Sequence, residues 1–185
     1  MFEIHITVVC PWRDLESFRE TCRELGVKSL VITLGGDVSQ YHVMTSSVFY
    51  GSFTEMLVEL QRICDGLSDY KIIRQKVETS PRMAEQLKQI ITPLYYEVHV
   101  EVDNHLLSNL PLDLECSWYV SNNINKPNYT ILTCRQICWD DRLAIERDYN
   151  SLISNQVLLD GVKGLLYEFA ILDTNPELDS TWIIK

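Results

Sequence analysis

The chain has 185 residues, of which 46% are hydrophobic and 23% are charged, and its formal net charge is −10. This apolar content is too high for a disordered chain. The sequence contains no run of about 18 apolar residues, so we expect no membrane span. The excess of acidic residues argues against nucleic-acid binding, because proteins that contact phosphates carry a basic surface.

The first half of the sequence predicts secondary structure in the order β-α-β-β-α-β. Apolar and polar residues alternate along residues 2–9, which is typical of a strand with one buried face. Pro11 and Gly26 suit the start and the end of a helix, and Ser52 with Glu55 forms a capping box for a second helix. The remaining predicted strands are residues 28–34, 41–50 and 70–78. This order is that of a ferredoxin-like unit.

The second half predicts the same order again. Glu97 and His99 lie 94 positions after Glu3 and His5, in a strand of the same pattern. The predicted strands are residues 95–102, 116–121, 129–137 and 165–176, and the predicted helices are residues 104–114 and 140–155. We therefore predict an α+β fold made by tandem duplication of a ferredoxin-like βαββαβ unit, with two antiparallel sheets and helices on their outer faces.

The domain organisation follows from this duplication. We expect residues 1–80 to form the first repeat, residues 81–94 a helical linker, and residues 95–185 the second repeat, within one compact pseudo-symmetric unit. Residues 95–185 contain 14 acidic and 6 basic residues, so most of the negative charge lies in the second half.

The six cysteines and the start of the sequence predict a cytoplasmic protein with reduced thiols. No C-x-x-C pair occurs, and the first residues lack the basic segment of a secretory signal. We expect no membrane and no nucleic acid as a partner, and the pattern predicts no oligomeric state.

The polar rows of the central strands predict a ligand site. In each repeat the apolar row should face the helices, which leaves the polar row on the free face of the sheet. If these faces meet, they enclose a cleft lined by charged groups, because burying unpaired charges is costly. The candidate catalytic residues are His5 and His99, and the candidate ligand-binding residues are Glu3, Thr7, Arg74, Lys76, Glu97 and Glu101. A solvated sheet face or a structural network explains the same alternation.

Two chemistries suit such a cleft. In one, His5 and His99 act as base and acid, while Arg74, Lys76 and Thr7 hold a phosphate. In the other, Glu97, His99 and Glu101, with Glu3 or His5 opposite, bind a divalent cation such as Mg²⁺ or Mn²⁺. In the closing strand, Phe169 and Ile171 take the positions of Arg74 and Lys76, so an anionic end of a ligand should lie toward the first half.

The sequence His5-Ile6-Thr7-Val8 resembles the H-x-[ST]-hydrophobic motif of the two-histidine (2H) phosphoesterases. That family is duplicated, with acid–base histidines and phosphate-holding hydroxyls in both lobes. The resemblance implies these roles for His5, Thr7 and His99. The second motif has Glu101 where the hydroxyl should be, and a carboxylate repels phosphate.

A broader resemblance covers most of the chain. The segments FEIHITV, ELGVK, MTSS, YYEVHVEV and YEFAILDTNPELDSTWI are similar to an uncharacterised family of about this length. Its patterns are FEVHVTV, ELGVKP, MTS, YFEHHVKL and YDSN-x-x-LD-x-GW. The resemblance implies a shared fold and brings no known activity. Asp173, Asn175, Asp179 and Trp182 match the closing pattern, where we expect turn-capping and core-packing roles, whereas Glu101 and Thr181 depart from it.

Three classes of function remain open at this point. The first is a protein that binds or processes a small anionic or phosphorylated ligand in the cleft around His5 and His99. The second is a 2H-like phosphodiesterase, and the third is a non-catalytic interaction platform. The geometry around the two histidines distinguishes the first two classes from the third.

Overall fold

The computed structural model describes residues 1–34, 37–105, 118–137, 143, 146–147, 149–150 and 162–182. The strands are β1 (Phe2–Val9), β2 (Lys28–Leu34), β3 (Asp37–Phe49), β4 (Lys71–Thr79), β5 (Tyr95–Asp103), β6 (Trp118–Asn123), β7 (Tyr129–Gln136) and β8 (Val162–Asp173). The helices are α1 (Leu15–Leu25), α2 (Phe53–Gly66) and α3 (Pro81–Leu87), with short 3-10 helices η1 (Trp12–Asp14) and η4 (Pro176–Trp182). The predicted helices at 104–114 and 140–155 lie largely outside the described residues.

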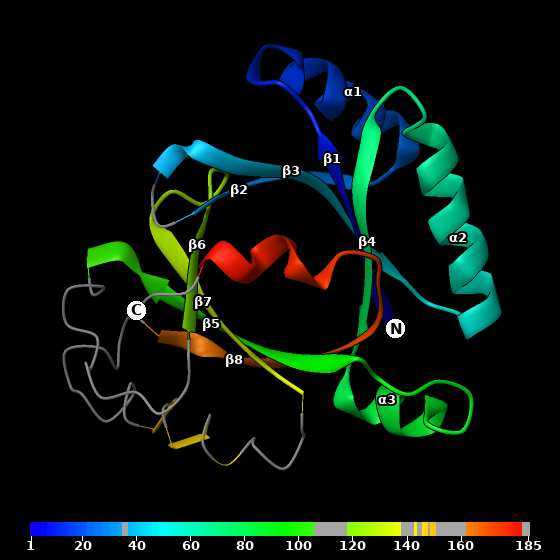
Figure 1. Cartoon of the computed structure of the whole chain (residues 1–185), viewed down its shortest axis with the longest axis vertical. Helices are drawn as coiled ribbons and strands as arrows, with labels where there is room; N and C mark the ends of the chain where they lie inside the picture. The colour runs from blue at the N-terminus through cyan, green and yellow to red at the C-terminus, as the bar shows by residue number, and fades with distance from the viewer. Residues whose placement is uncertain are drawn as a thin grey trace.

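These strands form one closed antiparallel barrel, in the order β1-β3-β2-β6-β7-β5-β8-β4 (Figure 1). Strands β2 and β6 pair at one seam between the two halves of the sequence, with Ile32 opposite Asn123. Strands β4 and β8 pair at the other seam, with Lys76 opposite Asp173. Closure leaves no sheet edge unpaired, and it places one face of every strand inside the barrel.

The predicted fold class is therefore wrong. We expected two ferredoxin-like repeats with separate sheets, in an internally duplicated α+β protein. The structure has a single sheet, because the edge strands of the two halves pair side by side. Alternation along a strand reveals which residues share a face, but it does not reveal which edges pair.

The outer face of β1 is apolar and lies under α1 and α2. Ile4 and Ile6 are fully buried in one cluster with Phe18 of α1 and with Met56 and Ile63 of α2. This cluster explains the alternation of the first strand. Both helices lie on the same side of the barrel (Figure 1). None of the helices in the described part of the chain has the length and apolar character that a membrane crossing requires.

Local signals place the end of α1 and the start of α2 as the sequence predicts, whereas Pro11 precedes the 3-10 helix η1 and α1 begins at Leu15. Gly26 ends α1 in the left-handed conformation with φ 72°, which costs glycine little. The Ser52 side chain accepts a hydrogen bond from Glu55 N, and the Glu55 carboxylate accepts one from Ser52 N, so the predicted capping box of α2 is confirmed.

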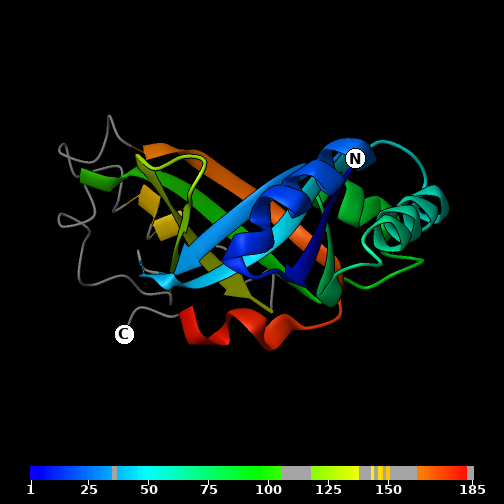
Figure 2. The ribbon, with the colours of Figure 1, turned by 90° about the horizontal axis from the view of Figure 1, so that it is seen from above.

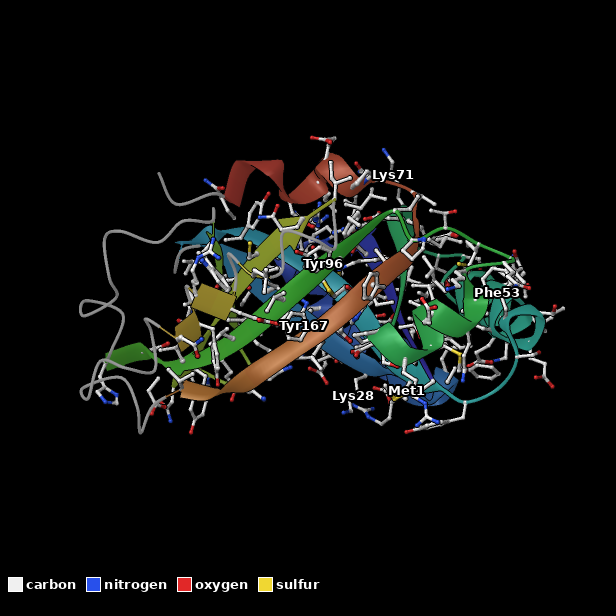
Figure 3. All side chains as sticks on the ribbon, turned by 90° about the horizontal axis from the view of Figure 1, so that it is seen from below. Met1, Lys28, Phe53, Lys71, Tyr96 and Tyr167 are labelled. Atoms are coloured by element: carbon white, nitrogen blue, oxygen red, sulfur yellow. The ribbon has the colours of Figure 1, made fainter. Side chains whose placement is uncertain are left out.

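The second half builds its own apolar cluster on the outer face of β5. Its buried members are Tyr96, Val98, Val100, Val102, Trp118, Leu132 and Cys134. Tyr167 of the neighbouring strand β8 packs against them (Figure 3). The cysteines of the described residues, Cys10, Cys22, Cys64 and Cys134, are free thiols.

The segment after β8 lies across one end of the barrel. Helix η4 crosses the barrel opening in the view of Figure 1 and lies to one side of the strands in the perpendicular view of Figure 2. It also contacts β6. One end of the barrel interior is therefore covered by η4.

Candidate functional site

The barrel encloses a cavity of about 640 Å³. Strands β1, β4 and β5 supply all eight residues that the sequence predicts for the site: Glu3, His5 and Thr7 from β1, Arg74 and Lys76 from β4, and Glu97, His99 and Glu101 from β5. The structure brings these residues together because the polar row of each strand faces the barrel interior. Their catalytic and binding roles stay predictions.

The candidate residues chosen from the sequence leave out several charged residues of the same cavity. Glu78 of β4, Arg135 of β7, Glu168 of β8 and Asp179 of η4 also line it. The sequence does indicate that Glu78 faces the cavity, because Glu78 follows the same alternation along β4 as Arg74. The others lie on elements whose inward face the sequence does not define.

Glu168 was missed because β8 contains a bulge. On β4, consecutive residues Val77 and Glu78 pair with Leu172 and Ala170, so Ile171 has no partner between them. One extra residue reverses which side chains point inward. The expectation that Phe169 and Ile171 face the site is therefore wrong: Glu168 lines the cavity, and Ile171 lies in the outer core.

Arg74 is the centre of an ion-pair group at the end of the cavity under η4, which we call the basal network. Its Nε and Nη2 atoms donate to the two carboxylate oxygens of Asp173 at 2.9 and 2.6 Å. Its Nη1 atom donates to Asp179 Oδ2 at 2.6 Å, and Nη2 also donates to the Tyr95 hydroxyl at 3.1 Å. Burial alone would lower the pKa of Arg74, but these acidic neighbours raise it.

Arg135 joins the basal network from the opposite side. It donates to Glu97 Oε1 from Nε at 2.8 Å and to Asp179 Oδ2 from Nη2 at 2.7 Å. Its Nη1 atom donates to the carbonyl of Pro176 at 2.6 Å, and its guanidinium lies 4.3 Å from the centre of the Tyr95 ring. Arg74 and Arg135 therefore both donate to the same oxygen of Asp179.

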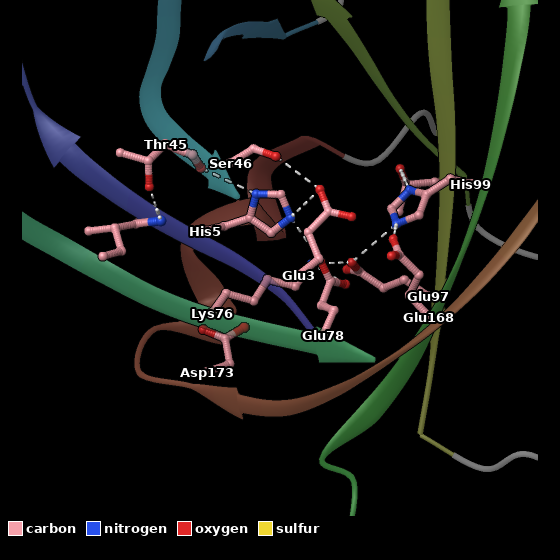
Figure 4. Close-up of polar contacts among 12 residues, drawn as sticks. Glu3, His5, Thr45, Ser46, Lys76, Glu78, Glu97, His99, Glu168 and Asp173 are labelled. Atoms are coloured by element: carbon pink, nitrogen blue, oxygen red, sulfur yellow. Dashed lines mark hydrogen bonds and ion pairs between the residues drawn. The ribbon is translucent and has the colours of Figure 1, made fainter. Parts of the chain in front are cut away.

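Lys76 links the basal network to the middle of the cavity. Its ammonium donates to Glu97 and lies 2.7 Å from Glu78 Oε1 (Figure 4). Burial acts to lower the pKa of Lys76, but the two carboxylates outweigh it and raise the pKa. The ammonium is therefore charged and already paired.

The next level of the cavity holds Glu3, His5, Glu78, His99 and Glu168, which we call the histidine cluster (Figure 4). His5 Nδ1 lies 3.3 Å from the carbonyl oxygen of Thr45, which can only accept, so Nδ1 carries the hydrogen of this bond. His5 Nε2 then faces Glu3 Oε1 at 3.3 Å and Glu78 Oε2 at 3.4 Å.

His99 is held in a similar way on β5. Thr133 Oγ1 lies 2.8 Å from His99 Nδ1, and this contact turns Nε2 toward Glu168 Oε2 at 3.4 Å and Glu97 Oε2 at 3.7 Å. Burial lowers the pKa of His99 despite the opposing effect of Glu97 and Glu78. The imidazole is therefore neutral at neutral pH.

The two buried carboxylates of the histidine cluster have opposite pKa shifts. Burial, together with the negative charges of Glu78 and Glu3, raises the pKa of Glu168 to about 8. Burial would also raise the pKa of Glu78, but Lys76 and His5 hold it well below its ordinary range. At neutral pH, Glu168 therefore carries a proton and Glu78 is ionised.

One group of donor atoms could hold a metal ion. Single atoms of Glu78, His99 and Glu168 lie within 4.8 Å of one another. The set predicted from sequence is not assembled in this way, because Glu97 is paired with Lys76 and Arg135, and Glu101 is paired with Lys126 at 2.8 Å. The Lys76 ammonium beside Glu78 opposes a second cation there.

Comparisons with known proteins identify no family: no protein-family model matches the sequence, and no curated protein matches it. Solved structures give weak similarities over most of the chain. A proposed monooxygenase from Fusobacterium nucleatum subsp. nucleatum ATCC 25586 has 10% identity and a TM-score of 0.34, covering 93% of this chain and 92% of its own. A second proposed monooxygenase, from Lactobacillus acidophilus NCFM, has 11% identity and a TM-score of 0.30, covering 92% of each chain. A chlorite dismutase variant from Candidatus Nitrospira defluvii has 10% identity and a TM-score of 0.29, covering 91% of this chain and 90% of its own. Scores this low do not establish a common fold.

Proposed function

We propose that the protein binds a small polar molecule inside the barrel and exchanges protons with it through His99 and Glu168. The observation that carries this proposal is the 3.4 Å contact between His99 Nε2 and Glu168 Oε2 inside the cavity, where burial lowers the pKa of His99 and raises the pKa of Glu168. Neighbouring groups whose pKa values are pushed in opposite directions are typical of acid–base sites.

The cavity suits a small molecule in size and in chemistry. Its volume of about 640 Å³ lies within the range of small-molecule pockets. Apolar side chains such as Leu30, Ile32 and Met44 line it together with the charged groups. A ligand there would meet apolar side chains as well as the histidine cluster.

The proposed chemistry is a proton transfer that restores the protein after each turnover. Glu168 donates a proton to the ligand and becomes a carboxylate, while His99 Nε2 accepts a proton from another atom of the ligand. The imidazolium of His99 then returns its proton to Glu168 across their 3.4 Å contact. The net result moves a proton within the ligand and needs no oxidant or reductant.

The cations of the cavity are already paired, which disfavours the anionic ligand predicted from the sequence. Arg74, Lys76, Arg135 and Lys126, the cations that line the described cavity, each contact a carboxylate. A phosphate would therefore compete with carboxylates for every one of them. We favour proton transfer on a polar ligand over phosphodiester hydrolysis for this reason.

NMR tests the proposal without knowledge of the ligand. With ¹⁵N-labelled histidine, the ring nitrogens of His99 should report a neutral imidazole at pH 7, and Glu168→Gln should leave it neutral because the amide mimics the protonated acid. A charged His99 at pH 7 would overturn the acid–base assignment.

A thermal-shift screen tests the binding itself. Amines, amides, carboxylic acids, sugar phosphates and nucleotides are screened with a chelator present. A compound that stabilises the wild type should lose its effect on His99→Ala and Glu168→Ala, and keep it on Glu59→Gln, a charge change on the outer surface of α2. In a separate measurement without chelator, a strong shift with Zn²⁺ or Mn²⁺ that Glu168→Gln abolishes would show that the carboxylates hold a cation instead.

A further inference from the structure

Asp179 differs from the other carboxylates of the basal network in the element that carries it. Glu97 and Asp173 lie on barrel strands, whereas Asp179 lies on η4, which covers the end of the barrel. Hydrogen bonds from Asn175 Nδ2 to the Ile73 carbonyl and from Arg135 to the Pro176 carbonyl hold the start of η4. Asp179 is thus delivered to the cavity by a segment outside the sheet.

The place that Asp179 occupies has the geometry of an anion site. Arg74 Nη1 and Arg135 Nη2 converge on the same oxygen, Asp179 Oδ2, at 2.6 and 2.7 Å. Two guanidinium groups that meet at one point favour an anion between them, and guanidinium is well matched to carboxylate.

This site would keep its shape if Asp179 withdrew. Arg74 would retain two hydrogen bonds to Asp173, and Arg135 would retain its bonds to Glu97. These partners lie on β8 and β5, so the two guanidinium groups would stay aimed at the vacated point. A binding site that is preorganised in this way loses little entropy when a ligand arrives.

The cavity leads to this point. Asp179, Arg74 and Arg135 all line it, whereas Asp173 does not, and the Asp173 side chain has no exposed surface. An anion inside the cavity could therefore reach the position of Asp179, but not that of Asp173.

We propose that Arg74 and Arg135 form a subsite for a carboxylate group of the ligand, and that Asp179 of η4 fills it until the ligand displaces it. The proposal rests on the proposed function in taking the cavity as the ligand site. It also explains how an anionic ligand could bind among cations that are already paired, since one carboxylate replaces another. A free carboxylate competes poorly with a tethered one, so binding needs the further contacts of the cavity.

Removal of the tethered carboxylate tests the subsite directly. Asp179→Ala should lower the melting temperature by several degrees, because the two guanidinium groups lose a shared partner. Sodium formate or acetate should restore the lost stability in a saturable way, and sodium chloride at the same ionic strength should not. Equal effects of formate and chloride, or no effect of formate, would overturn the proposal.

Asp173→Ala is the matched control, because it removes another carboxylate from the same arginine. Its loss should not be restored by formate, since Asp173 does not face the cavity. Recovery of both variants alike would show that formate acts generally and would contradict the subsite.

The test stays decisive if Asp179→Ala folds poorly. Refolding that succeeds in formate and fails in chloride supports the subsite, and refolding that fails in both overturns it. Neither experiment uses the protonation of His99 or Glu168, so the subsite and the proton transfer can fail separately.

Discussion

The basal network and the histidine cluster share one cavity but differ in their balance of charge. In the basal network, the cations of Arg74, Lys76 and Arg135 face the carboxylates of Glu97, Asp173 and Asp179, with direct hydrogen bonds between them. In the histidine cluster, Glu3, Glu78 and Glu168 share the space with two imidazoles.

This difference distinguishes the charged groups that stabilise the fold from those that are available for proton transfer or ligand binding. Where each carboxylate has a cation, burial is tolerated and the groups keep their charge. Where carboxylates exceed cations, one of them must take up a proton or a ligand, and Glu168 does so through a pKa of about 8. We therefore expect the functional groups of the cavity to be those that are not held in ion pairs.

The largest expected effect is loss of the central cation of the basal network. Arg74→Met should lower the free energy of unfolding by about 3–5 kcal/mol, because it leaves buried Asp173 without a cation and leaves Asp179 with Arg135 alone. Urea denaturation measures this loss, and Arg13→Met, at an exposed pair with Asp14, should change it by less than about 0.5 kcal/mol. A loss below about 1 kcal/mol for Arg74→Met would show that the network is not structural.

The second effect concerns the pH dependence of the histidine cluster. The pKa of Glu168 is raised in the folded protein from its ordinary 4.5 to about 8. Between these values the folded state keeps a proton that the unfolded state releases, so stability falls as the pH rises through this window. Relative to Glu168→Gln, the wild type should lose about 2–4 kcal/mol between pH 5 and pH 8. Urea denaturation at both pH values measures the difference, and parallel profiles would contradict the shift.

A smaller effect is expected when the base of the histidine cluster is removed. His99→Gln should lower the free energy of unfolding by only about 1 kcal/mol, since it exchanges one hydrogen bond to Thr133 for another. Thermal denaturation without ligand measures this change. Unfolding of this variant at room temperature would show that His99 is required for the stability of the fold.

The smallest effect is expected at a partly exposed pair that lines the same cavity. Glu101→Gln removes the contact with Lys126, whose side chain is 57% exposed. Such pairs contribute little, so the free energy of unfolding should change by less than about 0.5 kcal/mol. If Glu101→Gln lowered the free energy of unfolding as much as Arg74→Met, the buried and the partly exposed ion pairs of the cavity would not differ in their contribution to stability.

The sequence predicts the residues that line this cavity better than the architecture that encloses them. Strict alternation in β1 and β5 identifies Glu3, His5, Glu97 and His99 as one kind of surface, because the side-chain period of a strand is two. Local signals such as the Ser52 cap of α2 are equally direct.

The rest depends on contacts that no local pattern encodes. The pairing of β2 with β6 joins residues remote in sequence, and nothing in either strand specifies its partner. The bulge at Ile171 hides Glu168, because a shift of one residue inverts the apparent inward row. Asp173 and Asp179 match a family pattern, yet only the structure connects them to Arg74.

The two seams of the barrel also govern how the chain can reach this structure. Ile32 pairs with Asn123, and Lys76 pairs with Asp173, which lie 91 and 97 positions apart in the sequence. Contacts of such high sequence separation slow folding, because long loops must close before the pairs form. During synthesis, β4 has to wait for β8 before its outer edge is paired. The open edge and the charged inner face of the first half then depend on the last strand of the barrel, so ring closure is expected to be the late, rate-limiting step of folding.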